Sequence, residues 1–425
     1  MFSSFFSTAP PVDPNAPNFH PVSSAYQPSE LFGELEPKDT EWTCPGGFAV
    51  ETQIFYQLLE DGSSLMCQVI HSAVGVWYPT IQFTFKYYNA TTKEKTWKSV
   101  NVSNFITPPP GLDKRSSKAD EFTITYKPKP GSDTPETYLV TANLGEDLQI
   151  TMEVLRPASV PGFKVGNGPN GGFSYFGPDP KNAEGYVVHR FWPRTSATGM
   201  LVLKGQAIPF KGPGMFVHAI QGMRPNLVAS RWNFAHFQSE QHGGVSAIQM
   251  DFTTTDAYGR KGAGSGFVTV SVGSLVLGGK LAAVTAETKW PDEEPAANAG
   301  VISRAVHSKT AHDPDTGYDA PTEIVFRWAA PSIVPDAQGP IDATLTMDVG
   351  QPNAYKGLIE KVDVLAEIPY VIKTMVNYVA GTKPYIYQWV NPATLHVNVP
   401  AGLIPDVSGK TEVEGIVYSE ATFIS

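Results

Sequence analysis

Histidine side chains are the first candidates for chemistry in this sequence, because imidazole is the usual general base and metal ligand near neutral pH. His71, His189, His218 and His236 lie in or beside strand-like segments. None of them stands in an HxH, HExxH or HxxxH arrangement, the spacings that bring two imidazoles to one metal ion. We therefore interpret these histidines as structural or hydrogen-bonding residues, and we predict neither a metal nor a cofactor.

Carboxylates offer a second kind of chemistry, general acid–base catalysis. Glu287, Glu323, Asp348 and Asp363 lie on strand-like runs, and they would indicate an enzyme if two of them, or one of them and a histidine, converged on a ligand. Outward, solvated positions explain them equally well. The sequence has no GxSxG nucleophile elbow, and in GPGMFVHAIQGMRP the proline Pro213 removes a backbone donor that a phosphate loop would use. Neither a hydrolase nor a nucleotide site is favoured.

Composition excludes further classes of function. The net charge of -10 would repel nucleic acid and anionic bilayers, so no nucleic-acid partner is expected. No apolar run reaches the roughly 18 residues of a spanning helix, and the start lacks the basic and apolar regions of a signal peptide, which predicts a cytosolic protein. Cys44 and Cys67 form no CxxC pair, so we expect reduced, buried thiols and no thiol-based antioxidant enzyme.

The elements that must position these residues are strands. Period-two alternation begins at Glu51, and Asp61-Gly62 supplies the turn of a first hairpin. Further runs start at Ile81, Glu121, Thr137 and Asp147, and a second series extends from about residue 205 to the C-terminus. Many short strands and little helix predict an all-β protein built of barrels or sandwiches.

Three segments depart from this pattern. The proline-rich stretch before residue 40 is expected to form neither helix nor sheet and to act as a flexible tether. The segment Glu367 to Ala380 has helical spacing and is predicted to be one short helix. The stretch from Pro291 to Pro321 is polar and punctuated by Pro and Gly, which predicts a long surface loop. We divide the chain into residues 1–40, 41–205 and 206–425.

Eight blocks of the sequence stand out. They are CQVIHS from Cys67, PGFKVG from Pro161, YFGPDPKN from Tyr175, HRFWPR from His189, GPGMFVHAIQGMRP from Gly212, SRWNF from Ser230, GTKPYIYQW from Gly381 and the terminal YSEATFIS. Together these blocks strongly resemble the fungal survival-factor family. The resemblance implies two lipocalin-like antiparallel barrels, 41–205 and 206–425, and survival under oxidative stress. It also implies that the protein carries ceramide from the endoplasmic reticulum to the Golgi without vesicles. An eight-stranded barrel has room for one small apolar ligand.

The resemblance further implies membrane contact through the N-terminus. Phe2, Phe5 and Phe6 would lie on one side of a helical turn, and the family uses an N-terminal amphipathic helix in this way. The Pro10-Pro11 pair ends any helix after about two turns, which is shorter than a stable isolated helix. The expected location is the cytoplasm, with peripheral association with endoplasmic reticulum and cis-Golgi membranes and a nuclear pool as a further site.

Lipid contacts are expected where the family blocks mix apolar and polar side chains, because a ceramide has both an apolar tail and polar groups that need partners. The expected lipid-binding residues are Trp77, Phe191, Trp192, Met215, Phe216, His218, Trp232, Phe234, Tyr385 and Trp389. The alternatives are a lipocalin-like hydratase or cyclase acting on an apolar small molecule, and a stress-response scaffold that binds proteins through strand edges or the 291–321 loop.

Overall fold

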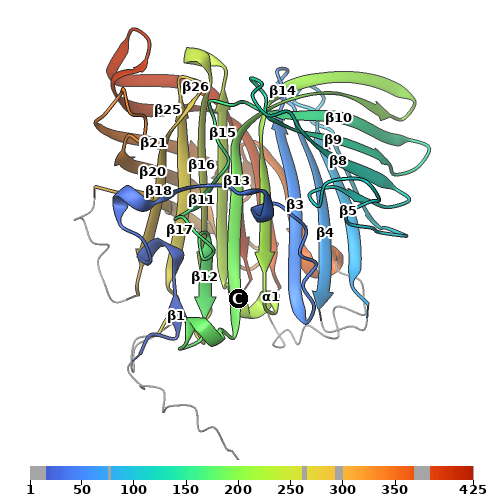
Figure 1. Cartoon of the computed structure of the whole chain (residues 1–425), viewed down its shortest axis with the longest axis horizontal. Coiled ribbons are helices and arrows are strands. Elements are labelled where there is room, and N and C mark those ends of the chain that lie inside the picture. Colours follow the sequence, from blue (N-terminus) through green and yellow to red (C-terminus); the bar gives the residue numbers. More distant parts are fainter. Residues whose placement is uncertain (1–15, 75–77, 261–265, 292–299, 368–382, 425) are drawn as a thin grey trace, which may run out of the picture.

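Two large antiparallel sheets form the protein (Figure 1). The structure is a computed structural model that describes residues 16–74, 78–260, 266–291, 300–367 and 383–424. Within these ranges the regular structure is almost entirely strand, so the all-β prediction is confirmed.

The first sheet has 14 strands and uses the N-terminal half of the chain. Its strands are β1 (Phe19–His20), β2 (Phe32–Glu34), β3 (Phe48–Leu58), β4 (Ser64–Val74), β5 (Thr80–Tyr88), β6 (Lys95–Asn101), β7 (Ser117–Lys118), β8 (Phe122–Pro128), β9 (Glu136–Asn143), β10 (Leu148–Arg156), β11 (Phe163–Val165), β12 (Phe173–Phe176), β13 (Gly185–Leu203) and β14 (Gln206–Gln221). The main path runs β6-β5-β4-β3-β14-β13-β10-β9-β8-β7.

The second sheet has 10 strands. They are β15 (Arg231–Ser239), β16 (Val245–Thr253), β17 (Thr269–Leu277), β18 (Lys280–Lys289), β19 (Ile302–His312), β20 (Asp319–Pro331), β21 (Pro340–Asp348), β24 (Leu358–Asp363), β25 (Tyr385–Ile404) and β26 (Val407–Phe423). The main path runs β18-β17-β16-β15-β26-β25-β21-β20-β19, and β24 pairs with β25. The small pieces β22 (Gly350–Gln351) and β23 (Ala354–Tyr355) pair with each other, and the short helices are α1 (Pro225–Val228) and α2 (Val364–Glu367).

Each sheet curls around its own side chains. In the first sheet the rings of Phe83 on β5 and Phe122 on β8 lie 5.1 Å apart, although their strands are far apart in the sheet order. Among the described residues no backbone ladder joins β6 to β8 or β18 to β19, so each sheet is a half-barrel that side chains fill. This is the expected lipocalin-like architecture in an open form.

The sequence pattern predicts the strands of the first sheet well. β3 and β4 form the expected hairpin, and Gly62 in its turn has φ +84°, a conformation that glycine adopts at little cost. In β8, Phe122, Ile124 and Tyr126 are buried, whereas the threonines between them are half-exposed. The alternation that predicted one inward face is therefore confirmed.

The expectation of a tether is wrong for residues 16–40. Phe19 is buried against Phe176 and Phe252, so it contacts both sheets. Asn18 accepts hydrogen bonds from the amides of Gly259 and Arg260 in the loop between β16 and β17 of the second sheet, while β2 pairs with β11 of the first. The prolines prevent long elements here, yet the short strands and turns between them still bury apolar side chains.

The expected surface loop from Pro291 to Pro321 is also wrong in its middle part. Residues Ile302–His312 form β19, which pairs antiparallel with β20. β19 is the last strand of its sheet, and most of its side chains are half-exposed or exposed. A polar edge strand of this kind lacks the apolar alternation that identifies a strand in sequence.

Strand pairing places the change of sheet after the predicted division between residues 205 and 206. That position falls in the turn between β13 and β14, which pair along almost their whole length. The chain passes to the second sheet between Gln221 and Arg231, across α1. The helix predicted for residues 367–380 lies outside the described residues apart from Glu367, the last residue of α2. Among the described residues no helix has the length and apolar character needed to span a membrane.

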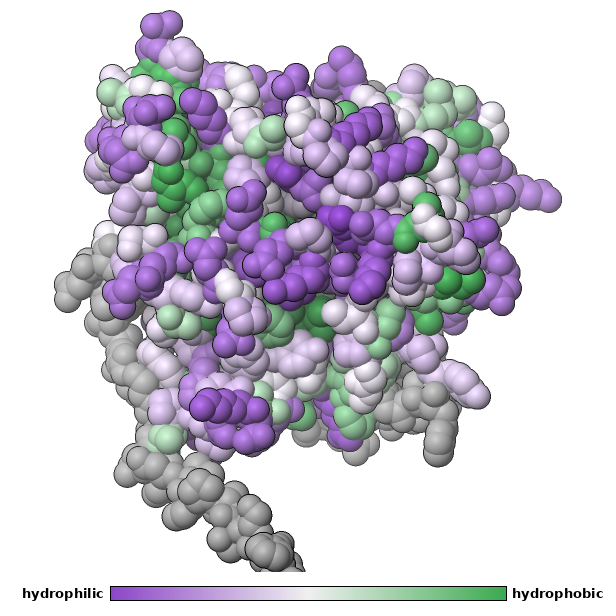
Figure 2. Space-filling view, viewed as in Figure 1, coloured by the Kyte–Doolittle hydropathy of each residue, from purple (hydrophilic) through white to green (hydrophobic). Residues whose placement is uncertain are grey.

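The visible surface is mostly polar. Figure 2 shows a hydrophilic face on which apolar residues form small, separate areas. Large apolar side chains are mainly buried between or inside the two sheets. An apolar ligand would therefore find its partners inside the molecule and not on this face.

Candidate functional site

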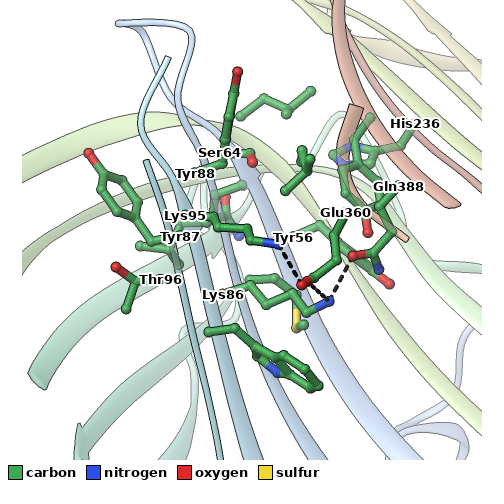
Figure 3. A pocket seen from close by; sticks show the side chains of 17 residues that line it. Tyr56, Ser64, Lys86, Tyr87, Tyr88, Lys95, Thr96, His236, Glu360 and Gln388 are labelled. Carbon is green, nitrogen blue, oxygen red and sulfur yellow. Dashed lines mark hydrogen bonds and ion pairs between the residues drawn. The ribbon is translucent and has the colours of Figure 1, made fainter. Parts of the chain in front are cut away.

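A pocket lies between the sheets, where β3 to β6 face β15 and β24 to β26 (Figure 3). Its enclosed space is about 30 Å³, enough for about two water molecules. Leu65 and Met66 from β4 and Ile359 from β24 contribute apolar surface to its walls. The pocket joins residues that are about 300 positions apart in the chain.

The back of the pocket is an aromatic cluster that spans both sheets. The ring of Tyr56 on β3 lies 5.2 Å from Phe234, 5.5 Å from His236 and 5.4 Å from Tyr418, which come from β15 and β26. Burial raises the pKa of Tyr56 and of Tyr418 well above the ordinary value, so both keep neutral hydroxyl groups. The cluster supplies a rigid, uncharged wall.

The mouth of the pocket is closed by four polar side chains, Lys86, Lys95, Glu360 and Gln388, which we call the mouth cluster. Lys95 Nζ lies 2.7 Å from Glu360 Oε1, and Lys86 Nζ lies 3.7 Å from Glu360 Oε2 (Figure 3). Lys86 Nζ also donates a hydrogen bond of 2.7 Å to Gln388 Oε1. The two lysines come from the first sheet and the two acceptors from the second, so these side-chain contacts connect the sheets.

A hydrogen-bonded chain leads inward from the mouth cluster. Gln388 Nε2 donates to Glu420 Oε1 at 2.7 Å, and the hydroxyl of Tyr418 donates to the same oxygen. The carboxylate of Glu420 therefore has two donors, and both ends of the Gln388 amide are engaged. Polar groups on this side of the pocket are already partnered.

Three other polar side chains of the lining, Gln57, Trp97 and His236, have buried atoms without a hydrogen-bond partner among the described residues. Gln57 is 1% exposed, but it follows Tyr56 on β3, so its side chain lies on the opposite face of the strand, inside the first sheet with Phe55. His236 is also 1% exposed, and its ring lies beside that of Tyr56, between the sheets. Burial lowers the pKa of His236 to about 3, so its imidazole is neutral near pH 7.

A second polar group lies inside the first sheet. His218 Nε2 is 2.8 Å from Glu51 Oε1, and both side chains are fully buried. Glu51 also accepts hydrogen bonds from the amides of Thr43 and Cys44, and His218 Nδ1 donates to the carbonyl of Asp39 at 2.8 Å. Burial acts to raise the pKa of Glu51, but the hydrogen bond from His218, its charge and the two amides together lower it.

This buried network fixes residues 39–44 to the first sheet. Asp39 is 3% exposed, and its carboxylate accepts two hydrogen bonds from Lys164 Nζ, at 2.8 and 3.0 Å. Arg190 Nε lies 3.6 Å from the same carboxylate. Because Glu51 and His218 bind main-chain groups of residues 39–44, their geometry supports the structural interpretation of His218.

The expected lipid contacts fall into three places, and those that the structure describes lie outside the pocket lining. Trp192, Phe216 and His218 lie inside the first sheet. Between the sheets lie Phe191, Met215, Trp232 and Phe234, and on the inner side of the second sheet lie Tyr385 and Trp389. Trp77 lies outside the described residues. Phe234 comes nearest to the pocket, because it packs directly behind Tyr56.

The carboxylates considered for catalysis do not converge on the pocket. Glu287 pairs with Arg304, Glu323 with Lys309, and Asp348 with Lys356. Asp363 accepts hydrogen bonds from the amides of Leu365 and Ala366 in α2.

The described part of the chain contains no site suited to metal or thiol chemistry. No group of three or more His, Cys, Asp or Glu side chains there is placed to hold a metal ion. Burial, and then the charge of Glu51, raise the pKa of Cys44 to about 12, and burial raises that of Cys67 further. Both thiols therefore stay protonated near neutral pH.

Sequence reasoning identified His236 only as a possible base or ligand, and it missed the mouth cluster. The run IQFTFKYYN predicts β5, and its alternation places Lys86 on the face opposite Phe85. Nothing local to Lys86 indicates that Gln388 is its partner, because β25 reaches it only through the folding of the second sheet. Sequence reasoning also missed the apolar and aromatic wall of the pocket, because an aromatic residue in a sequence usually indicates a core position.

Comparison with known proteins adds a family and a fold. A family model described as the Svf1 family matches residues 2–425. A Schizosaccharomyces pombe protein named ceramide-binding protein svf1 is 32% identical over 100% of this chain and 98% of its own length. A Yarrowia lipolytica protein with the name ceramide-binding protein SVF1 is 33% identical over 96% of this chain and 94% of its own length.

Among solved structures, that of CghA is similar over 89% of each chain, with a TM-score of 0.57 and 12% sequence identity. At this identity the likeness concerns the fold alone. The match covers both sheets, which agrees with the lipocalin-like architecture predicted from the sequence.

Proposed function

The chain belongs to the Svf1 family, and from this premise we propose that it binds one ceramide molecule in the pocket between its two sheets and carries it through water. The observation that carries the proposal is full-length identity of about one third with relatives that are named for ceramide binding. Membership of the family confirms the resemblance drawn from the sequence blocks.

The chemistry of the pocket supports this ligand. Leu65, Met66 and Ile359 offer apolar surface to an alkyl chain, and each buried CH₂ group contributes about 0.8 kcal/mol. Trp97 Nε1 and His236 Nδ1 offer hydrogen-bonding groups to the polar end of the lipid. A space of about 30 Å³ is far too small for an alkyl chain, so binding requires the sheets to part at the mouth cluster. Side chains, not a backbone ladder, join them there.

The remaining parts of the proposal concern membranes and physiology. The protein moves ceramide from the endoplasmic reticulum to the Golgi, works from the cytoplasm with peripheral association with both membranes and a nuclear pool, and supports survival under oxidative stress as a consequence of lipid handling. Phe2, Phe5 and Phe6 make the membrane contact; they lie outside the described residues. The ten expected lipid contacts remain candidates for a lipid-bound form in which the sheets have moved apart.

We propose a carrier and not an enzyme. The catalytic alternative needs an acid–base pair that faces the ligand, and Glu287, Glu323, Asp348 and Asp363 are engaged elsewhere. Native mass spectrometry with lipid extraction, on protein purified from a eukaryotic host, tests the proposal. A ceramide bound one to one is the expected result. Protein that carries no lipid after incubation with ceramide vesicles, or that returns a chemically altered lipid, would overturn it.

The membrane contact has its own test. Replacing Phe2, Phe5 and Phe6 together by serine removes the apolar side of the N-terminus, so we expect weaker sedimentation with uncharged vesicles and an unchanged melting temperature. Replacing Ser3, Ser4 and Ser7 by alanine serves as the matched control and should leave sedimentation intact. Equal sedimentation of wild type and the serine variant would contradict the proposed contact.

A further inference from the structure

The exposed aromatic rings of this protein come from separate loop ends. Among the described residues the exposed Phe, Tyr and Trp side chains are Phe48, at 39%, Phe267, at 47%, and Tyr78, at 84%. Phe48 is the first residue of β3, whereas Tyr78 and Phe267 lie just before β5 and β17. Isolated exposed apolar residues are common on protein surfaces, so the positions of these three rings relative to one another decide whether they form a surface.

Strand pairing places the three rings at the same end of both sheets. Phe48 pairs with Val74 at the end of β4, and β5 begins opposite Ser72 of the same strand. In the second sheet β17 begins opposite the end of β16, which lies opposite Arg231 at the start of β15. The chain connects the two groups, because it passes from the end of β14, beside the start of β3, across α1 to Arg231. This end is the lower side of Figure 1, where β1 and α1 also lie.

Two arginines at this end have no carboxylate partner among the described residues. The guanidinium of Arg224 lies 4.3 Å from the centre of the Phe48 ring. Arg231 is exposed, and its guanidinium lies 5.5 Å from the centre of the Phe423 ring. Neither guanidinium makes an ion pair or a hydrogen bond with another described residue. Their N–H groups are therefore available to an external acceptor.

The local charge at this end differs in sign from the charge of the whole chain. The segments around the two arginines contain no Asp or Glu, although the chain has 41 acidic and 31 basic side chains. These segments are residues 45–48, 78–80, 221–231 and 421–424. Exposed charges are screened beyond about 8 Å at physiological ionic strength, so the distant carboxylates that make the net charge -10 have little effect here.

The backbone at Phe267 supports a role for its ring outside the core. Its φ of +71° lies in the left-handed region, which is unfavourable for a bulky side chain. Because the ring is 47% exposed, packing does not compensate this conformation. Strained residues of this kind are found mainly where function requires them. Near Phe267 the charges of Asp256 and Arg260 balance each other, so the ring is the main feature that a partner would meet.

We propose that this end of the fold docks on bilayers that contain anionic phospholipids, as a second membrane contact besides the N-terminal phenylalanines. Aromatic rings are favoured at the headgroup level of a bilayer, and an arginine binds phosphate oxygens through paired N–H groups. Rings on separate loop ends can enter a fluid headgroup layer together, whereas a peptide partner needs a continuous groove or strand edge. We call this surface the aromatic edge; it consists of Phe48, Tyr78, Arg224, Arg231 and Phe267.

The aromatic edge is continuous with the start of the described chain. β1 pairs with β12 beside the start of β13, at the same end of the first sheet. A bilayer that binds the N-terminal residues therefore lies close to the aromatic edge. The docking surface does not depend on which ligand the pocket between the sheets holds.

The test is sedimentation of the full chain with vesicles of phosphatidylcholine alone and of phosphatidylcholine mixed with phosphatidylserine. Each arginine near an anionic surface strengthens binding about fivefold, which corresponds to about 1 kcal/mol. We therefore expect wild type to bind the mixed vesicles at least about tenfold more tightly, and we expect added salt to remove this preference. The variant with serine at positions 2, 5 and 6 should keep the preference, because the arginines are intact.

Paired substitutions separate the rings from the charges. Tyr78→Ser with Phe267→Ser should weaken binding to both kinds of vesicle. Arg224→Gln with Arg231→Gln should abolish only the preference for mixed vesicles, and the corresponding change of both arginines to lysine should keep most of it, since a lysine also carries a positive charge. Melting temperatures show whether each variant folds as wild type does.

Two matched controls lie away from the aromatic edge. Met200→Ser with Val306→Ser removes exposed apolar side chains in the middle of β13 and β19. Lys127→Gln with Lys129→Gln removes two exposed positive charges at the end of β8, which changes the net charge as much as the arginine pair does. Both controls should bind the two kinds of vesicle as wild type does.

Three results would overturn the inference. Wild type may bind both kinds of vesicle equally, the controls may lose as much binding as the aromatic-edge variants, or the aromatic-edge variants may bind as wild type does. If wild type forms dimers and Tyr78→Ser with Phe267→Ser is a monomer with unchanged vesicle binding, the surface is a protein interface and the inference is also wrong. None of these results bears on the proposed carrier function, because the ceramide content of the purified protein is measured separately.

Discussion

At the scale of single residues, burial shifts the pKa of several ionisable side chains. Asp251 on β16 is 2% exposed and accepts a hydrogen bond of 2.9 Å from Asn233 Nδ2. Asn233 Oδ1 accepts in turn from His307 Nε2 at 2.7 Å, so that nitrogen of His307 carries a proton. Burial raises the pKa of Asp251 to about 7, although the hydrogen bond from Asn233 acts to lower it. The second sheet therefore contains a carboxyl group that titrates near neutral pH.

Asp251 predicts a specific pH dependence of stability. Because its pKa is raised in the folded state, the folded chain binds a proton that the unfolded chain releases above about pH 4, and stability falls as the pH rises from about 4 to about 7. Asp251→Asn removes this loss, so the melting temperature of the variant relative to wild type should rise between pH 5 and pH 8. The exposed Asp342→Asn, whose ion-pair partner Arg327 stays charged in this pH range, is the control. A difference that does not change with pH would show that Asp251 is ionised throughout.

At the scale of elements, the N-terminal segment, residues 16–44, acts as a strap across both sheets. Ser24 hydrogen-bonds to Thr288 of β18, and Leu35 donates its amide to the carbonyl of Gly162 near β11. Its end is fixed by Glu51 through the amides of Thr43 and Cys44. Fixed ends and a buried middle make a proline-rich chain part of the core.

Glu51→Gln tests this anchoring. The substitution removes the buried negative charge that His218, Thr43 and Cys44 surround, and breaking a buried pair costs about 3 to 5 kcal/mol. We expect a lower melting temperature and earlier proteolytic cleavage near residues 40–47, identified by mass. Since the pKa of Glu51 is lowered by the fold, its contribution is present above about pH 4.5 and is lost as the pH falls.

The matched control for Glu51→Gln is Glu60→Gln, whose side chain pairs with Lys211 and is 52% exposed. Its effect on stability should stay within about 0.5 kcal/mol. Equal effects of the two substitutions would contradict the anchoring role of Glu51.

At the scale of the whole molecule, the mouth cluster couples the two sheets and predicts how ligand exchange can be stopped. Lys95→Cys and Glu360→Cys place thiols on opposite sheets at side chains that meet in wild type. Cross-linking them with a short bismaleimide should slow ceramide exchange at least tenfold, because the sheets no longer part, and should retain lipid bound beforehand. Cys44 and Cys67 react poorly, since burial raises the pKa of both thiols.

Two controls accompany the cross-link. N-ethylmaleimide modifies the same two thiols without joining them and should leave exchange fast. A second pair, Gln82→Cys and Asn101→Cys, joins neighbouring positions on β5 and β6 within one sheet and should also leave exchange fast. Unchanged exchange in the protein cross-linked between residues 95 and 360 would place the entry route elsewhere.

How far the sequence predicts this molecule depends on the range of the interaction. Alternation in EFTITY and the Asp61-Gly62 turn predict β8 and the β3–β4 hairpin, because both depend on neighbouring residues. The burial of Phe19 and the strand β19 were missed, because one depends on two distant sheets and the other is a polar edge. The pocket was missed for the same reason, since Lys86 and Gln388 meet only in the finished fold.

The order of strands in the second sheet has a consequence for the synthesis of the chain. All strands of the first sheet have been translated once Gln221 is made, so this half can begin to fold on the ribosome. β15, the next strand in sequence, has β26 as one of its two neighbours, so it stays unpaired on that side until β26 has been translated. Three of the strands around the pocket, β24 to β26, are among the last to be translated. A nascent chain therefore has no complete pocket until translation has almost finished.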